Sequence, residues 1–303
     1  MSAANPGKEG VKEIMASVDS IATPKISRIS PPTNANEPAP AAGLRFPLAA
    51  GNLFKWLVPP VLGLALFIGI WAMVAQGNPT LPGPLKTWDS AVQLFSDPFY
   101  RNGPNDQGIG WNILSSLERV AIGFGMAALT GIPLGFMIGR FDFLNRMTAP
   151  IISLLRPVSP LAWLPIGLLV LKAADPAAIW VIFISSIWPM IINTSVGVTR
   201  IPQDYMNVAK VLNLSEWKIF TRILFPAVLP YMITGIRLSI GVAWLVIVAA
   251  EMLTGGVGLG FWVWDEWNNL NVEHIIIAIF VVGIVGLLLE QALVLLAKKF
   301  SYE

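Results

Sequence analysis

Two arginines and a glutamate stand inside or at the end of long apolar runs of this chain: Arg156, Arg237 and Glu251. The arginines carry guanidinium groups, whose forked N–H donors match a planar oxyanion. Because an ionisable side chain within a membrane span is costly, each of the three is a candidate for a path that an anion follows. The alternative for Arg237 is a structural pair with a carboxylate or with backbone carbonyls. The alternative for Arg156 is snorkelling towards the membrane interface.

Glu251 follows Arg237 by 14 residues, or about 21 Å along one helix, so the two cannot pair. A carboxylate repels an anion, which favours a gate or a structural role for Glu251. Its expected partner is Arg119, or else a protein on the outer side. Asn193 and Ser239 are polar candidates for the wall of the path, and the alternative is that each joins packed helices.

These side chains lie in a chain with the composition of a membrane protein. Hydrophobic residues make up 55% of it and charged residues 13%, against about 25% charged in soluble domains. A membrane-spanning helix needs about 20 apolar residues. The sequence therefore predicts an all-α membrane protein with six transmembrane helices, at 54–76, 119–138, 149–171, 177–195, 227–250 and 275–297.

Two local patterns describe how these spans pack and bend. Gly131, Gly135 and Gly139 repeat every four residues, which predicts close packing against another helix of the bundle. Pro157 and Pro160 fall in the third span, and they are expected to bend it and to free backbone carbonyls. Broken helices of this kind often line transport paths.

The distribution of Lys and Arg predicts the orientation. With the N-terminus inside, the inner segments hold fourteen Lys and Arg and the outer segments three, as the positive-inside rule requires. Both termini and the segment 196–226 are then cytoplasmic. We expect a disordered cytoplasmic tail at 1–50, rich in Pro and Ala, followed by a membrane domain at 51–303. The net charge of +2 argues against a nucleic-acid partner.

The loop at 203–226 contains the start and stop signals of two short helices around a bend. Asp204 suits the first turn of a helix, and Val208, Val211 and Leu212 form an apolar stripe at helical spacing. Asn213 tolerates the left-handed conformation of a tight turn, and Ser215 is expected to cap the next helix. The apolar face of that second helix is predicted at Trp217, Phe220, Ile223 and Leu224. Such a knob fits a groove of a soluble partner; the alternative is an amphipathic helix lying among lipid headgroups.

This loop resembles the one by which membrane subunits of binding-protein-dependent ABC importers contact their ATPases. The pattern of that family is E-A-A, three residues, Gly, nine residues, I-x-L-P. Here Asn207, Val208 and Ala209 take the E-A-A positions, Asn213 takes the Gly, and 223–226 close the motif. The resemblance implies a cytoplasmic coupling helix between spans four and five, with ATPase contacts at Asn207, Val208, Ala209, Asn213, Leu214, Ser215, Glu216, Trp217 and Phe220.

Segments around the loop resemble the nitrate/sulfonate/taurine/bicarbonate class of these permeases, most of all the cyanobacterial nitrate-transport subgroup. They include LLRPVSPLAWLPIGLLV at 154–170, VLPYMITGIRLSIG at 228–241 and GLGFWVWDEWNN at 258–269. The resemblance implies a homodimer in the bacterial inner membrane, two cytoplasmic ATPase subunits and an external substrate-binding protein. It also implies import of nitrate or nitrite, with bicarbonate as the alternative substrate.

The chain lacks the residues of several other chemistries. The Walker pattern G-x-x-x-x-G-K-[ST] does not occur, so ATP and magnesium are expected on the partner ATPases, with no cofactor and no enzymatic activity in this chain. There is no Cys and one histidine, His274, which excludes thiol chemistry and a multi-histidine metal site. The glycines at 255–260 are expected to form a tight outer turn. The remaining alternatives are a stand-alone secondary carrier or channel and a structural membrane scaffold.

Overall fold

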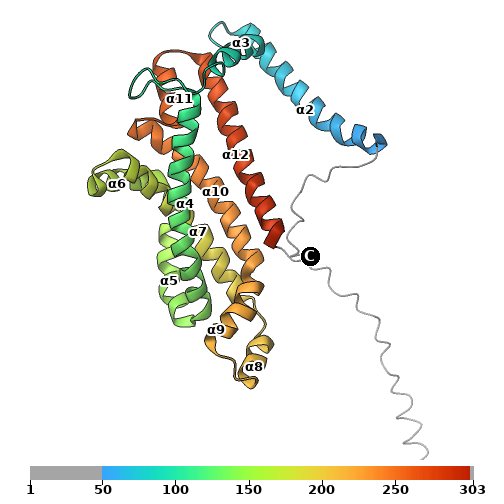
Figure 1. Ribbon diagram of the computed structural model, residues 1–303, viewed down its shortest axis with the longest axis vertical. Helices are drawn as coiled ribbons and strands as arrows, with labels where there is room; N and C mark the ends of the chain where they lie inside the picture. The colour runs from blue at the N-terminus through green and yellow to red at the C-terminus, as the bar shows by residue number, and fades with distance from the viewer. Residues whose placement is uncertain (1–49, 301–303) are drawn as a thin grey trace, which may run out of the picture. The chain divides into compact units, whose positions relative to one another are not determined.

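The computed structural model describes residues 50–300, and within that range every regular element is a helix, beside one isolated β-bridge between Arg101 and Gln107 (Figure 1). The predicted tail at 1–50 lies almost wholly outside the described residues. The chain divides after Leu64, within helix α2, into two units. The described part of the first unit is the beginning of α2 (Ala50–Gly77), which contains Pro59 and Pro60.

All other helices belong to the second unit. Their bounds in chain order are α3 Pro84–Leu94, α4 Ile109–Arg140, α5 Asp142–Leu155, the 3-10 helix η1 Pro160–Trp163, α6 Leu164–Leu171, α7 Ala174–Thr199, α8 Gln203–Val211, α9 Glu216–Ile219, the π-helix η2 Phe220–Leu224, α10 Phe225–Thr254, α11 Leu259–Asn268 and α12 Val272–Phe300.

Five described helices are long and apolar enough to cross a membrane, and the number is six if a bent pair counts as one span. That pair is α5 with η1–α6, which meet at 95°. The all-helical prediction is confirmed, and so is the bend near Pro157 and Pro160. The third span was predicted to begin at 149, but α5 begins at Asp142. Polar Asp142, Asn145 and Arg146 at its start hid this first turn from a count of apolar residues.

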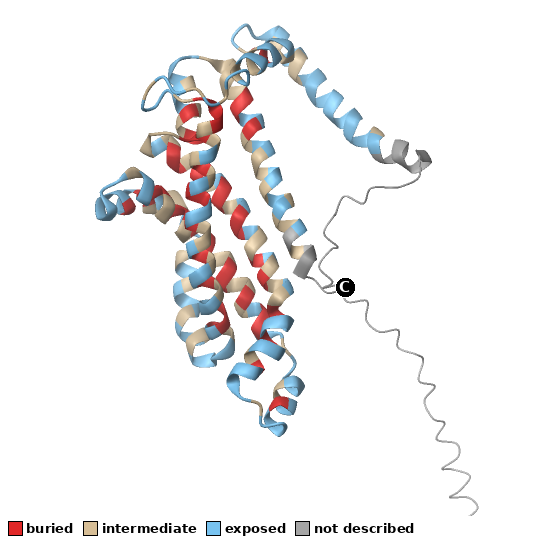
Figure 2. Cartoon of the chain, viewed as in Figure 1, coloured by how far each residue is buried: buried red, intermediate tan, exposed pale blue. Residues whose placement is uncertain are grey.

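The centre of the second unit is α7, which packs between α4 and α10 (Figures 1 and 2). The predicted small-residue face of α4 is confirmed. A Cβ atom built at Gly135 would lie 2.7 Å from the Cβ of Thr194, and one at Gly139 would lie 2.6 Å from the Cβ of Val198. These distances are shorter than real contacts, so α4 and α7 approach this closely only because the side chains are absent.

The two ends of this bundle differ. The 203–226 loop, with α8, α9 and η2, lies at one end of α10, and α11 lies at the other (Figure 1). Buried residues follow the facing sides of α4, α7 and α10, whereas the outer faces carry exposed apolar side chains (Figure 2). A helix bundle with an apolar outer surface is suited to a lipid environment.

Candidate functional site

The tip of the 203–226 loop presents apolar side chains to its surroundings. The exposed fractions are 60% for Tyr205, 57% for Val208, 85% for Val211 and 63% for Leu212. Within α8 itself, Ala209 is fully buried. The predicted apolar stripe therefore exists, but it faces away from the rest of the chain, which leaves its apolar surface uncovered.

The bend after α8 forms as predicted. Asn213 has a φ of 50°, in the left-handed region. The N–H of Leu214 donates to the carbonyl of Ala209 at 3.0 Å, which closes the turn. Ser215 stands at the N-cap position of α9, although its side chain does not bond to the described helix. Asn207 and Glu216 lie exposed on either side of this bend.

The buried face of the helix after the bend differs from the predicted one. Ile219 and Leu224 are the buried residues, and Trp217 is 72% exposed. The reason is the π-helix at Phe220–Leu224, because a π turn brings residues five apart onto one side. Phe220 is half-buried and points to α4, where its ring lies 5.0 Å from that of Phe136. Phe220 therefore anchors the loop to α4.

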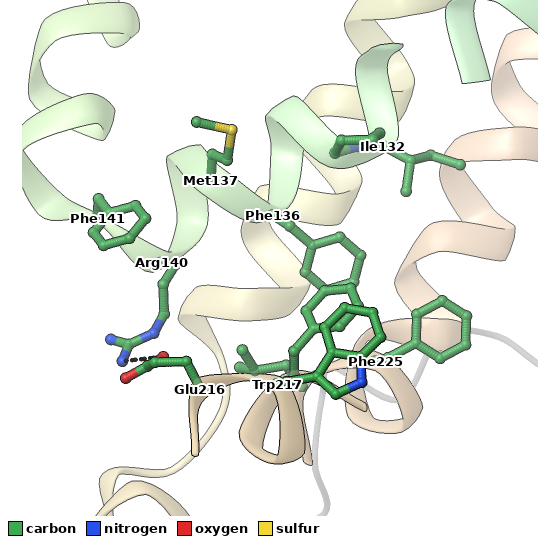
Figure 3. Close-up of a pocket in the computed structure, with 11 residues that line it drawn as sticks. Ile132, Phe136, Met137, Arg140, Phe141, Glu216, Trp217 and Phe225 are labelled. Atoms are coloured by element: carbon green, nitrogen blue, oxygen red, sulfur yellow. Dashed lines mark ion pairs between the residues drawn. The ribbon is translucent and has the colours of Figure 1, made fainter. Parts of the chain in front are cut away.

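A groove lies where this loop meets the end of α4 (Figure 3). Its volume is about 470 Å³. The rings of Trp217 and Phe220 stack at 5.8 Å on the loop side. Arg140 and Glu216 are the charged lining residues, and Nη2 of Arg140 lies 3.6 Å from Oε2 of Glu216. The lining residues are Ile132, Pro133, Phe136, Met137, Arg140, Phe141, Glu216, Trp217, Phe220, Leu224 and Phe225.

At the opposite end of the bundle, Glu251 is buried to 1% exposure and pairs with Arg119, as predicted. Nη1 of Arg119 donates to Oε1 of Glu251 at 2.6 Å. Arg119 also donates to Asp175 at the start of α7, through Nη2 at 2.7 Å. The guanidinium thus joins α4, α7 and α10 by charge-assisted hydrogen bonds.

The same carboxylate holds the glycine-rich turn. The hydroxyl of Ser116 and the backbone N–H of Gly260 donate to Glu251 at 2.8–2.9 Å. Asn112 accepts from the N–H of Gly258 at 2.9 Å. The expected tight turn is present, with φ of 77° at Gly255 and 95° at the next residue. We call Asn112, Ser116, Arg119, Asp175, Glu251 and the backbone of 257–260 the Arg119–Glu251 network.

Arg156 and Asn193 line one cavity of about 430 Å³ beside the bend between α5 and η1. Arg156 follows the last residue of α5, so it lies about 21 Å along the span from Asp142 and well away from its beginning. Arg156 is exposed in the described chain, so the path role and interfacial snorkelling both stay predictions. Asn193 donates to the carbonyl of Pro189 at 2.8 Å. The polar side chain of Ser185 and the apolar side chain of Leu238 also line this cavity.

The other three path candidates lie outside the lining of this cavity. Nη2 of Arg237 donates to Oε1 of Glu290 on α12 at 3.1 Å, so the structural pair considered for Arg237 is present. Ser239 is fully buried and donates to the carbonyl of Ser186 at 2.7 Å. Ser239 thus joins α10 to α7. The buried Glu251 is held in the network.

Sequence reasoning missed Glu290, Asp175 and the polar pair Asn112 and Ser116 as partners. Glu290 had a signal, because it is an ionisable residue within the predicted span 275–297. Asp175 precedes the predicted span at 177–195 and starts the observed α7. Asn112 and Ser116 also had a signal, because with Arg119 they follow the i, i+4, i+7 spacing of one helix face. No spacing pattern joins Asp175 to Arg119 or Glu290 to Arg237, since these partners are 56 and 53 residues apart.

The fold and these sites define a multi-pass helical membrane protein with an apolar knob at one end. The chain belongs to the family of binding-protein-dependent transport system inner membrane components, which matches residues 131–302. Members of this family are permease subunits of ABC importers rather than their ATPases.

Individual relatives share much of the chain. It is 48% identical to the nitrate import permease protein NrtB of Synechocystis sp., over 78% of this chain and 86% of that protein. It is 47% identical to the protein of that name from Leptolyngbya laminosa, over 82% of this chain and 89% of the relative. It is 46% identical to the bicarbonate transport system permease protein CmpB of Synechocystis sp., over 81% and 89% respectively.

A solved structure shares the fold. A chain of the MetNI methionine ABC transporter, in an inward-facing conformation, aligns with a TM-score of 0.55 and 12% identity. The alignment covers 63% of this chain and 95% of that one. At this identity the likeness concerns the helical architecture alone.

Proposed function

We propose that this chain is the membrane-spanning subunit of an ATP-driven importer for nitrate or nitrite. The observation that carries the proposal is the exposed apolar tip of the 203–226 loop, at Tyr205, Val208, Val211 and Leu212. An apolar helix face that the chain itself leaves uncovered fits a groove in a partner. The substrate is supported by the names of the relatives that are 47–48% identical.

The partners follow from the family. Two ATPase subunits would bind ATP and magnesium and take the 203–226 loops, and an external binding protein would deliver the anion. A second copy of this chain would complete the pathway between two protomers. The protein would lie in the bacterial inner membrane with both termini in the cytoplasm, as the Lys and Arg distribution favours. The tail at 1–50 would precede the membrane domain at 51–303.

Among the path candidates, the geometry favours Arg156 and Asn193. Both line one cavity, beside a bend where a membrane span is interrupted. Irregular backbone at membrane depth is tolerated where it lines a cavity, and an arginine there presents forked donors to a small anion. Arg237 is paired with Glu290, which lowers its net attraction for an anion.

In an alternating-access cycle, movement at the ATPase end would control whether the pathway opens at the outer end. ATP binding would draw the two ATPase subunits and their bound loops together, and the pathway would open outward. Hydrolysis would restore the inward-open state. Each state is favoured by the contacts that the partners make in it.

Bicarbonate is the second candidate substrate, because a bicarbonate permease is 46% identical to this chain. The deciding experiment measures ATPase activity of the complex, with its binding protein, in lipid nanodiscs. Stimulation by nitrate and not by bicarbonate is the expected result. Stimulation by bicarbonate alone would keep the mechanism and overturn the substrate. A chain that carries no ATPase and transports the anion alone would be a stand-alone carrier.

A further inference from the structure

The groove between α4 and the 203–226 loop lies at the end of a helix that is long and apolar enough to span a membrane. It runs along α4 from Ile132 to its last residue, Arg140, which is about 12 Å of helix measured inward from the end of a membrane span. Its volume of about 470 Å³ is within the range of about 300–1,000 Å³ of small-molecule sites. An apolar groove beside the end of such a helix suits a lipid acyl chain.

The walls of the groove are largely aromatic. The rings of Phe136 and Phe225 stack at 6.4 Å. The ring of Phe220, which comes from the loop, lies 5.0 Å from that of Phe136 and 6.2 Å from that of Phe225. Trp217 stands at the end of the groove and is 72% exposed, a usual position for tryptophan at the level of lipid headgroups. Figure 3 shows the aromatic side chains together and the charged pair at one edge.

The charged edge is suited to an anionic headgroup. Arg140 is the last residue of α4, and a basic side chain at the end of a membrane-spanning helix suits the headgroup level. Its Nη2 lies 3.6 Å from the carboxylate of Glu216, which is 80% exposed, and this separation exceeds a hydrogen bond of about 2.7–3.2 Å. By contrast Arg146 on α5 holds Asp142 at 2.7 Å. The donors of Arg140 therefore remain available to a phosphate oxygen.

From these observations we propose that the groove binds an anionic phospholipid, with one acyl chain against Phe136 and Phe225 and the phosphate on Arg140. The lipid then contacts α4 and the segment Glu216–Phe225 at the same time. It fixes the 203–226 loop to the membrane end of α4, so the composition of the bilayer affects how the loop moves. This site takes no part in nucleotide or substrate binding.

The test compares lipids retained by the full-length protein, using native mass spectrometry after reconstitution with equal phosphatidylglycerol and phosphatidylcholine. Met137→Trp fills the groove from α4, since Met137 lines it and is 48% exposed. Met126→Trp is the matched control, on the same helix, outside the groove and 47% exposed. We expect Met137→Trp to lose the retained phosphatidylglycerol and Met126→Trp to keep it.

A second pair of variants tests the headgroup without touching the apolar walls. Arg140→Gln should lower the preference for phosphatidylglycerol over phosphatidylcholine by about fivefold, the effect of one basic residue near an anionic surface. Arg146→Gln, on an 81% exposed side chain outside the groove, should leave it unchanged. This second pair tests whether Arg140 binds the anionic headgroup even if Met137→Trp does not fold.

Two results would overturn the proposal. One is equal phosphatidylglycerol retention in all four variants. The other is efficient cross-linking of Met137→Cys to its counterpart in a second copy, in a chain that has no other cysteine. That result would make the groove a subunit interface. Neither readout depends on ATPase or transport activity, so failure here leaves the proposed function standing.

Discussion

The Arg119–Glu251 network and the 203–226 loop lie at opposite ends of α10 and are built in opposite ways. In the network, a carboxylate with 1% exposure accepts hydrogen bonds from Arg119, Ser116 and Gly260. In the loop, Val211 and Leu212 are 85% and 63% exposed and cover no other part of the described chain. One end therefore satisfies its own polar groups, whereas the other leaves an apolar face for another molecule.

The difference indicates how a permease can transmit movement. The network holds α4, α7, α10 and the turn at 257–260 through bonds that lose strength quickly with distance, so these elements should move as one body at that end. The loop meets α4 mainly through aromatic contacts such as Phe136 with Phe220, which are less directional. In the proposed complex, movement of the loop would reach this bundle through η2, which continues directly into α10.

The largest expected effect comes from opening the network. Glu251→Ala removes a buried partner of Arg119 and should lower stability by about 3–5 kcal/mol, since an uncompensated buried charge is costly. The melting temperature of the purified chain in detergent measures it. Asp142→Ala is the control, because that carboxylate is 72% exposed in its pair with Arg146 and should cost at most about 1 kcal/mol. Equal shifts in both variants would contradict the distinction between the two ends.

The next effect is at the loop and should leave stability alone. Val211→Ala with Leu212→Ala should weaken ATPase binding about tenfold, because a few residues at the centre of an interface carry most of the binding energy. Co-purification of the ATPase subunit measures it. Leu169→Ala with Val170→Ala is the matched pair on α6, with exposures of 77% and 71%. Unchanged co-purification in the α8 variant would reject the docking surface.

A third effect separates the two arginines of the path. Arg156→Gln should lower nitrate uptake about tenfold at unchanged ATPase binding, as expected for the loss of one charged hydrogen bond of about 1.5 kcal/mol. The double change Arg237→Gln with Glu290→Gln removes both members of a pair and should leave uptake per folded complex within about twofold of the original. A larger loss of uptake in the double variant than in Arg156→Gln would indicate that the anion path follows the α10–α12 face.

Hydropathy predicted the spans because about 20 apolar residues in sequence suffice to define one, and turn chemistry predicted the bend at Asn213. The roles of Ser239 and Arg237 depended on which faces of α10 meet α7 and α12. Those faces are set by packing between distant helices and not by local spacing. The π-helix at 220–224 was missed for a related reason, since its extra residue shifts Ile219 inward against the period of an α-helix.

The smallest effect concerns Asn213, whose φ of 50° shapes the loop tip. Asn213→Ala should lower local stability by about 1 kcal/mol. The left-handed conformation is strained for a residue that has a Cβ and no local side-chain hydrogen bond. Asn213→Gly should be neutral or slightly stabilising, since glycine enters that region without strain. Hydrogen exchange of the N–H of Leu214, which closes the turn at 3.0 Å, measures both. Equal protection in the two variants would mean that the partner, and not the chain, sets the conformation of the tip.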